Sequence, residues 1–389
     1  MFKLAQRLAK IPPYLFAELD LLKKEVISKG IDVIDFGVGD PDLPTPRFIV
    51  NALKRAVENS ERQKYPSYEG MMEFRESVAR FYKRRKNVKI DPESQVISLI
   101  GSKEGIAHLP LAFINKGDFV LVPDPGYPVY FSAAILANGT PFKLPLMGDN
   151  NFLPRLEEIP RNVARKAKIM FLNYPNNPTT AIATKEFIKE VIDFCKDNEI
   201  ILAHDAAYSE ITFDGYRSHS FLEYDSGFEV VIEFNSLSKS YNMTGWRIGF
   251  ACGNEEIISG LLKVKTNVDS GVFEAIQVAA ATALDYGDKV IDENCRIYEK
   301  RRDVLVEGLR ELGFKIKSPK ATFYVWCNVG GSSIEFTKKL LNKTGIVVTP
   351  GIGFGEFGEG YVRFALTKTV NKIQEAIERM KSSFSKDAF

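Results

Sequence analysis

The sequence predicts an α/β protein with a largely parallel sheet between helices and a smaller α/β domain beside it. Stretches of helical periodicity alternate with apolar runs of strand length at residues 96–100, 119–122, 169–172, 200–203 and 230–234. A chain of 389 residues is too long for one simple core, so a second unit is expected. We predict an N-terminal arm with part of the small domain at 1–45, a large domain at 46–275, and an interdomain helix with the small C-terminal domain at 276–389.

Composition and charge exclude several classes of function. The chain has 52 basic and 50 acidic residues, and a net charge of +2 gives no reason to expect nucleic acid or a membrane surface as a partner. Four cysteines without a CxxC pair and three histidines argue against a disulfide framework and against a metal site. The N-terminus lacks the apolar core of a signal peptide, and no run of 18 apolar residues occurs, so we predict a cytoplasmic protein.

The first third of the chain offers two candidate ligand contacts. Tyr14 follows two prolines at the start of a helical stretch, where its ring either packs in the core or points into a cleft. Residues 37–42 superficially suggest a dinucleotide loop, but the third glycine of that motif is missing and a proline stands inside it. Gly39 instead permits close approach of the backbone to a ligand. Farther on, residues 83–86 are four cations that we expect to face solvent at a helix end.

The stretch from Ser236 to Arg247 carries the most specific chemistry. It lies between two apolar runs, so we expect it to form a turn between two strands. The hydroxyls of Ser236 and Ser238 and the guanidinium of Arg247 can then converge on one anion, such as a phosphate. Burial and nearby cations disfavour the ammonium form of Lys239, and an unprotonated amine attacks carbonyl groups. A phosphate together with an amine-reactive aldehyde indicates pyridoxal phosphate.

Candidate ligand contacts also follow other predicted strands. A turn at residues 101–105 opens a helix, whose free amide groups make a natural anion cup. Tyr127 lies among prolines and can stack on a flat ring. Asp205 ends an apolar strand, which is where ligands bind in open α/β sheets, although an acid at that position is also a common helix cap. We therefore expect these groups to meet at one edge of the sheet.

The C-terminal part is predicted to be one long helix followed by a small domain. The helix spans residues 271–312, and the strands after it lie at 314–316, 322–327, 346–348 and 361–365. Arg363 lies in the middle of an apolar strand, where an arginine is costly unless it is paired. Its planar fork matches a carboxylate, either of another side chain or of a ligand.

Together these motifs resemble those of the fold type I aminotransferases, classes I and II. The likeness rests above all on Ser238 and Lys239, followed at eight residues by Arg247, and can be traced from about Tyr14 to Arg363. It implies a PLP-transferase fold with a mainly parallel seven-stranded sheet and pyridoxal 5'-phosphate as cofactor. It also implies a homodimer with composite active sites, because Tyr65 of one subunit would reach the phosphate bound by the other.

The resemblance further implies a role for each candidate residue. The catalytic residues would be Lys239, which holds the cofactor aldehyde as a Schiff base, Asp205, which keeps the pyridine nitrogen protonated, and Tyr208, which bonds the ring oxygen. The cofactor contacts would be Tyr65, Ser102, Lys103, Tyr127, Asn177, Asp205, Tyr208, Ser236, Ser238, Lys239 and Arg247. The substrate contacts would be Tyr14, Gly39, Lys103, Tyr127, Asn177 and Arg363. The chain departs from the family at Thr180, where glycine is usual.

Within the family, residues 123–130, 173–177 and 204–210 look most like those of the enzymes that transaminate LL-2,6-diaminopimelate with 2-oxoglutarate. In the biosynthetic direction these enzymes use tetrahydrodipicolinate and glutamate, by a ping-pong mechanism. Glutamate–pyruvate (alanine) enzymes share residues 12–14, 101–105 and 238–243 and are the alternative, followed by enzymes of aspartate or broad specificity. A pyridoxal phosphate lyase would not consume a 2-oxo acid, and a transcription regulator would need a DNA-binding domain ahead of this fold.

Overall fold

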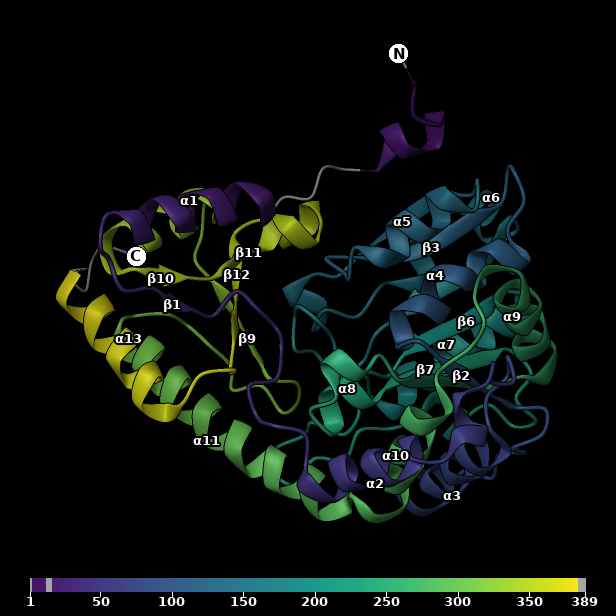
Figure 1. The fold of residues 1–389 in the computed structure, drawn as a ribbon. Helices are drawn as coiled ribbons and strands as arrows, with labels where there is room; N and C mark the ends of the chain where they lie inside the picture. Colours follow the sequence, from purple (N-terminus) through teal and green to yellow (C-terminus); the bar gives the residue numbers. More distant parts are fainter. Residues whose placement is uncertain (1, 12–15, 384–389) are drawn as a thin grey trace.

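The fold consists of a large sheet covered by helices, with a smaller part beside it (Figure 1). The computed structural model describes residues 2–11 and 16–383. The large sheet has seven strands in the order β2-β8-β7-β6-β5-β3-β4. Neighbouring strands are parallel except at β8, which runs antiparallel to both β2 and β7. The prediction of a mainly parallel seven-stranded sheet is confirmed.

The strands of this sheet are short and mostly buried. Their bounds are β2 Val96–Leu99, β3 Phe119–Asp124, β4 Thr140–Pro145, β5 Ala167–Leu172, β6 Ile201–Asp205, β7 Val231–Ser236 and β8 Gly249–Gly253. Strands buried on both faces are continuous apolar runs in sequence. The sequence analysis missed β4, which is an edge strand that carries two prolines and is only partly buried.

Helices cover both faces of the sheet, because successive strand residues point to opposite sides. Val120 and Ile169 pack with α4 Ser102–Phe113, α5 Val129–Leu136 and α9 Glu255–Val268. Leu121 and Met170 pack on the other face with α2 Arg47–Val57, α3 Met72–Lys86, α7 Lys185–Asp197 and α10 Glu274–Tyr286. The remaining short helices are η1 Gln6–Lys10, η2 Ser60–Gln63, η3 Gly148–Asn150, η4 Leu156–Glu158, α6 Arg161–Ala164, η5 Phe221–Glu223, α8 Leu237–Ser240, η6 Thr244–Trp246, η7 Gly351–Phe354 and η8 Glu356–Gly358.

The smaller part combines both ends of the described chain. A three-stranded sheet has the order β11 Thr349–Pro350, β12 Tyr361–Ala365, β9 Tyr324–Asn328, and β1 Ile34–Asp35 pairs with β10 Ile346–Val347. The helices of this part are α1 Phe16–Ser28, α11 Asp288–Glu311, α12 Ser333–Thr344 and α13 Val370–Ser383. Its core is separate from the two cores of the large sheet. We propose the division at residues 45/46 on this basis, with α11 as the interdomain helix (Figure 1). The expected division at 275/276 falls inside α10, whose Ala279, Ala280 and Ala283 pack in the core of the large sheet.

Two predicted elements of the C-terminal part are wrong. The single helix over 271–312 is interrupted at Gly287, between α10 and α11. A Cβ at Gly287 would lie 2.5 Å from a ring carbon of Tyr241, so this ring packs directly against the backbone there. Residues 314–316 are irregular rather than a strand. The Ile316 carbonyl accepts hydrogen bonds from the Arg310 guanidinium at 2.8 and 3.1 Å instead of entering a sheet.

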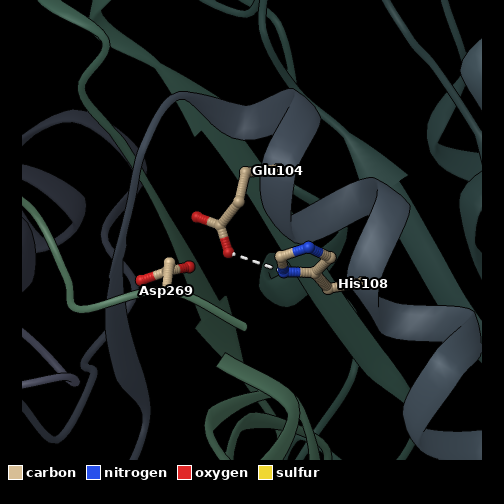
Figure 2. Close-up of side chains that lie close together, drawn as sticks. All are labelled: Glu104, His108 and Asp269. Atoms are coloured by element: carbon tan, nitrogen blue, oxygen red, sulfur yellow. Dashed lines mark hydrogen bonds and ion pairs between the residues drawn. The ribbon is translucent and has the colours of Figure 1, made fainter. Parts of the chain in front are cut away.

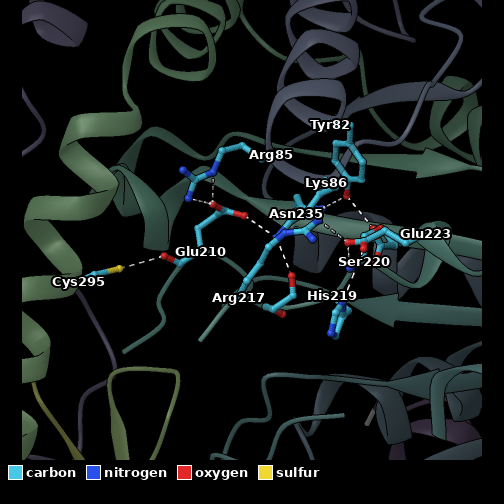
Figure 3. Close-up of polar contacts among 12 residues, drawn as sticks. Tyr82, Arg85, Lys86, Glu210, Arg217, His219, Ser220, Glu223, Asn235 and Cys295 are labelled. Carbon is cyan, nitrogen blue, oxygen red and sulfur yellow. Dashed lines mark hydrogen bonds and ion pairs between the residues drawn. The ribbon is translucent and has the colours of Figure 1, made fainter. Parts of the chain in front are cut away.

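The cations at residues 83–86 divide into two pairs, of which Figure 3 shows Arg85 and Lys86. Lys83 and Arg84 are exposed as predicted, whereas the prediction is wrong for Arg85 and Lys86. Their charged groups lie 2.6 and 2.8 Å from carboxylate oxygens of Glu210, whose side chain is only 3% exposed. A buried carboxylate needs such partners, and the two cations hold the pKa of Glu210 below its usual value against the effect of burial. These ion pairs attach α3 to the segment that follows β6.

A contact between the small part and the large sheet lies at the end of β3. Asp124 accepts a hydrogen bond from the Phe357 amide at 3.0 Å, and Lys143 lies 3.0 Å from Asp124 and 2.9 Å from Glu356. Gly355 has a φ of 135°, and a Cβ there would lie 2.0 Å from an Asp124 oxygen. The segment 354–357 therefore fits closely against Asp124.

Within the described residues, none of the helices is both long and apolar enough to cross a membrane.

Candidate active site

The ends of neighbouring strands bring many of the predicted site residues to one edge of the large sheet. Leu99 at the end of β2 pairs with Gly249 in β8, and Gly249 pairs with Ser236 at the end of β7. Asp205 at the end of β6 pairs with Phe234, two residues before Ser236. The carboxyl ends of parallel strands lie at the same edge, which is where open α/β sheets bind ligands.

Lys239 is the central amine of this edge. It lies in the one-turn helix α8, directly after β7, rather than in an open turn. Burial lowers its pKa to about 8, with Arg247 and Arg363 acting in the same direction and Asp40 and Asp205 opposing them. A substantial fraction of this amine is therefore neutral near pH 8, which suits it to attack a carbonyl group or to accept a proton.

Asp205 is a buried carboxylate beside this amine. It accepts hydrogen bonds from the Tyr130 hydroxyl at 2.7 Å and from the Ala207 amide at 3.2 Å. Burial raises its pKa, which the hydrogen bond from Tyr130 opposes. Both of these donors are neutral, so a cation placed next to the carboxylate would strongly stabilise its charged form. The protonated ring nitrogen of a pyridine is such a cation.

Two further predicted residues lie next to this carboxylate. The Tyr127 ring meets the Tyr130 ring edge to face, with centroids 5.8 Å apart. Lys103 Nζ lies 5.9 Å from the centroid of the Tyr127 ring. The structure therefore brings Tyr127 and Lys103 together, and Tyr130 connects Tyr127 to Asp205. Tyr130 has no role in the sequence analysis, although its spacing of one helical turn from Tyr127 was a signal that could have revealed it.

The start of α4 and the end of β7 form a cup of hydrogen-bond donors at this edge. Ser102 is the first residue of α4, so its amide belongs to the open N-terminal turn of a helix. A Cβ at Gly101 would lie 2.2 Å from Arg247 Nη2, and one at Gly249 would lie 2.9 Å from the Ser102 amide nitrogen. The two glycines thus let Arg247 and this turn approach each other. Ser236 and Ser238 are buried at the adjoining strand end. Helix amides, hydroxyls and a guanidinium suit a phosphate.

Arg363 occupies the small-domain side of the site. It is 6% exposed; Nη1 donates to Asn177 Oδ1 at 2.6 Å and Nη2 donates to the Gly37 carbonyl at 3.0 Å. Its Nε is buried and has no acceptor among the described residues. A buried donor without an acceptor is uncommon and points to a missing ligand oxygen. A carboxylate is the group that this guanidinium fits best.

Tyr324 is a second site residue that the sequence analysis missed. Its ring lies 4.1 Å from the Arg363 guanidinium carbon, and its hydroxyl is 3.0 Å from that of Tyr208. A Cβ at Gly39 would lie 2.1 Å from the Tyr324 hydroxyl, so the expected close approach at Gly39 is to this side chain. In sequence, Tyr324 sits in an apolar, aromatic run that is typical of a core strand. Only its hydroxyl could have signalled a polar role.

Tyr65 is 89% exposed on a surface loop, so its side chain points to solvent rather than into the buried site of its own chain. Tyr14 lies outside the described residues. Thr180 has a φ of 62°, so the threonine adopts the left-handed backbone that glycine would favour. Its amide donates to the Asn176 carbonyl at 3.0 Å, and the local turn is kept without glycine.

A nucleophilic lysine, a buried aspartate, a phosphate cup and an arginine with a free donor fit a pyridoxal phosphate site. The model of the aminotransferase class I and II family matches residues 31–380, and the chain belongs to this family. The protein is therefore an aminotransferase that depends on pyridoxal phosphate.

Similar proteins support this assignment. The chain is 55% identical over 381 residues to the LL-diaminopimelate aminotransferase of Halothermothrix orenii, with coverage of 97% of this chain and 98% of that protein. It is 54% identical to the enzyme of the same name from Syntrophobacter fumaroxidans, with 98% of each chain covered. Among solved structures, substrate-bound BacF from Bacillus subtilis has a TM-score of 0.93 and 38% identity, with 98% of both chains covered.

Proposed function

We propose that this aminotransferase acts on LL-2,6-diaminopimelate with 2-oxoglutarate, and on tetrahydrodipicolinate with glutamate in the biosynthetic direction. The names of the relatives, which match over nearly the whole chain, support the substrate. The observation that carries the transfer chemistry is the unsatisfied Nε of Arg363, because it predicts a carboxylate in the same site as Lys239. Both substrates of a transamination carry such a carboxylate.

The chain's own residues would divide the work between binding and proton transfer. Pyridoxal phosphate, when bound, supplies an aldehyde that condenses with amines and a ring that takes up electrons. Arg363 and Asn177 would hold the α-carboxylate of the substrate, and Tyr127 would stack on the ring. Neutral Lys239 Nζ would take the proton from the substrate Cα and deliver it to the carbon of the cofactor's aldehyde group, and it would move a proton in the opposite direction during the second half of the ping-pong cycle.

The other site residues would hold the cofactor. Asp205 would keep the ring nitrogen protonated, and Tyr208 would donate its hydroxyl proton to the ring oxygen. The phosphate would be bound by the helix turn and by the side chains around it, namely Ser102, Lys103, Ser236, Ser238 and Arg247. We also infer a reducing compartment such as the cytoplasm, because Cys195, Cys252, Cys295 and Cys327 are all free thiols.

We further propose a homodimer whose partner supplies Tyr65 to the phosphate. Tyr65 is 89% exposed, and its loop packs on the segment around Gly271, whose Cβ would lie 3.0 Å from the Ser67 carbonyl. Large exposed apolar side chains flank both segments: Tyr68, Met72, Val268 and Phe273. An apolar patch of this kind typically marks an interface, and soluble homo-oligomers are most often twofold dimers.

Mixed subunits test the composite site. Lys239→Ala and Tyr65→Ala homodimers should both have low activity, because each of their sites lacks one essential residue. Mixing them should restore about a quarter of the wild-type activity, since half of randomly mixed dimers are hybrids and one of their two sites is intact. Activity that stays at the sum of the two parents after subunit exchange, or a fully active monomer in sedimentation, would contradict the shared site.

The substrate is tested by comparing LL-diaminopimelate, alanine and aspartate, each with 2-oxoglutarate. We expect kcat/KM to be highest for LL-diaminopimelate by at least about tenfold, because a site built for a distal ammonium and carboxylate loses polar contacts with shorter substrates. Lys103 is also a proposed phosphate contact, so the comparison is made at saturating cofactor; Lys103→Ala should then raise the barrier for LL-diaminopimelate by about 1–3 kcal/mol and that for glutamate less. A preference for alanine would replace this proposal with glutamate–pyruvate transamination. Turnover without a 2-oxo acid would indicate a lyase.

A further inference from the structure

A cluster of three ionisable side chains lies beside the candidate phosphate turn: Glu104, His108 and Asp269 (Figure 2). The carboxylates could be read as cation ligands, but the ammonium of Lys265 already engages them. Lys265 Nζ donates to Glu104 Oε2 at 3.2 Å and to the two Asp269 oxygens at 2.9 and 3.0 Å. Lys265 is 0% exposed, so its charge depends on these acids. The cluster is an ion-pair link between α4 and the end of α9.

Glu104 connects this link to the turn that precedes α4. Its Oε2 accepts a hydrogen bond from the Ile100 amide at 2.9 Å, while the Ile100 carbonyl accepts one from Arg247 Nη2 at 3.4 Å. Gly101 follows with a φ of 78° and lies directly against Arg247. Residue 100 is thus held on one side by Glu104 and on the other by a proposed phosphate ligand.

Asp269 connects the same link to the loop that bears Tyr65. Its Oδ1 accepts a hydrogen bond from the Gly271 amide at 2.7 Å, which fixes the turn after α9. Gly271 has a φ of 85°, and its Cβ position lies 3.2 Å from Pro66 Cγ and 3.0 Å from the Ser67 carbonyl. Lys265 therefore joins the phosphate turn of a subunit to the base of the loop that Tyr65 extends from.

We propose that Glu104 is a positioning residue for the cofactor phosphate. It fixes residue 100, and through it the Ser102 amide and Arg247, while Lys265 and Asp269 hold Glu104 in place. This inference rests on the proposed placement of the phosphate in the cup. The length of the Glu104 side chain is what matters for this role, because it allows the carboxylate to extend from α4 to the Ile100 amide.

Two substitutions distinguish the effect of the side-chain length of Glu104 from the effect of its charge. Glu104→Gln keeps the reach and an acceptor oxygen but loses the charge, whereas Glu104→Asp keeps the charge but is one methylene shorter. The cofactor-depleted full-length protein is titrated with pyridoxal phosphate and with pyridoxal, which lacks the phosphate. We expect Glu104→Asp to weaken pyridoxal phosphate about tenfold, from the loss of the hydrogen bond between its carboxylate and the Ile100 amide, and to leave pyridoxal unchanged. Glu104→Gln keeps an acceptor for this amide and leaves Asp269 paired with Lys265, so it should stay close to the wild type for both.

The controls make each outcome decisive. Arg247→Met should weaken pyridoxal phosphate selectively, and His108→Ala, which alters only the other Glu104 oxygen, should not. If Arg247→Met is selective and Glu104→Asp is not, the positioning role is overturned while the phosphate cup stands. If Arg247→Met is not selective, the placement of the phosphate fails and the inference fails with it. Equal losses for both ligands, or a Gln variant as weak as the Asp variant, would also overturn it. Glu104→Ala, which lacks reach, serves the comparison if Glu104→Asp does not fold.

Discussion

Replacing Lys239 with alanine should abolish transamination, lowering kcat by at least about four orders of magnitude, while the protein stays folded. The reason is chemical: the amine with a pKa of about 8 is the group that can both bond an aldehyde and move a proton at the substrate Cα. Alanine is also well tolerated in a helix such as α8. After borohydride reduction, the wild-type chain should keep the mass of the cofactor at residue 239, and the variant should not.

The pH dependence of aldehyde capture checks the same assignment. Because the neutral amine is the nucleophile and burial lowers its pKa to about 8, capture by the cofactor-depleted wild-type protein should rise with pH and level off above about 8. An ordinary exposed lysine would still be gaining reactivity near pH 10. Covalent retention of the cofactor by Lys239→Ala, or ordinary turnover by this variant, would show that another amine is the catalytic one.

Replacing Arg363 with lysine should lower kcat/KM by about 10²–10³-fold, since truncating one partner of a buried hydrogen-bonded charge pair costs about 2–5 kcal/mol. Lysine is a point charge without a planar fork, so it cannot serve Asn177, the Gly37 carbonyl and a carboxylate together. LL-diaminopimelate and glutamate should lose a similar factor, because both present an α-carboxylate. Affinity for pyridoxal phosphate should remain near that of the wild type.

A matched control is available on the neighbouring strand. Thr349 pairs with Arg363 in the small sheet, and its hydroxyl lies 3.5 Å from Arg363 Nη2 and donates to the Gly37 carbonyl. Thr349→Val keeps the shape and the cation, so kcat/KM should fall by only a few-fold. If Arg363→Lys weakens the cofactor and leaves kcat/KM unchanged at saturating cofactor, Arg363 serves the cofactor and not the substrate.

Buried strands and their polar ends were the predictable part of this molecule. Strands such as β5 and β6 are mostly apolar because both faces of the sheet are covered. The last residue of such a strand falls at the ligand edge, so Asp205 could be selected from its position alone. The edge strand β4 has no such pattern, because prolines interrupt it and its side chains are partly exposed.

Contacts between distant segments were the unpredictable part. Nothing local to Tyr324 reveals that its ring covers Arg363 or that Gly39 lies against its hydroxyl, since these residues come from separate strands and a loop. At Gly287, where the predicted helix breaks, the close neighbour is likewise the Tyr241 ring, which lies far away in sequence. Arg85 and Lys86 were predicted to face solvent because their partner Glu210 lies far away in sequence, after β6. The residue type predicted which kind of interaction a side chain makes at these positions. The partner could be identified only from the folded structure.

The close fit at Asp124 restricts how this scaffold can change its substrate. Asp124 receives the small-domain segment 354–357 and stands three residues before Tyr127, on the same strand end. The sheet that carries Arg363 is thereby fastened to the base of the loop that carries Tyr127. This contact therefore fixes the distance between the Arg363 guanidinium, which is proposed to hold the carboxylate, and the Tyr127 ring, which is proposed to stack on the cofactor. We expect variants that accept a longer or shorter amino acid to differ elsewhere and to leave this contact in place.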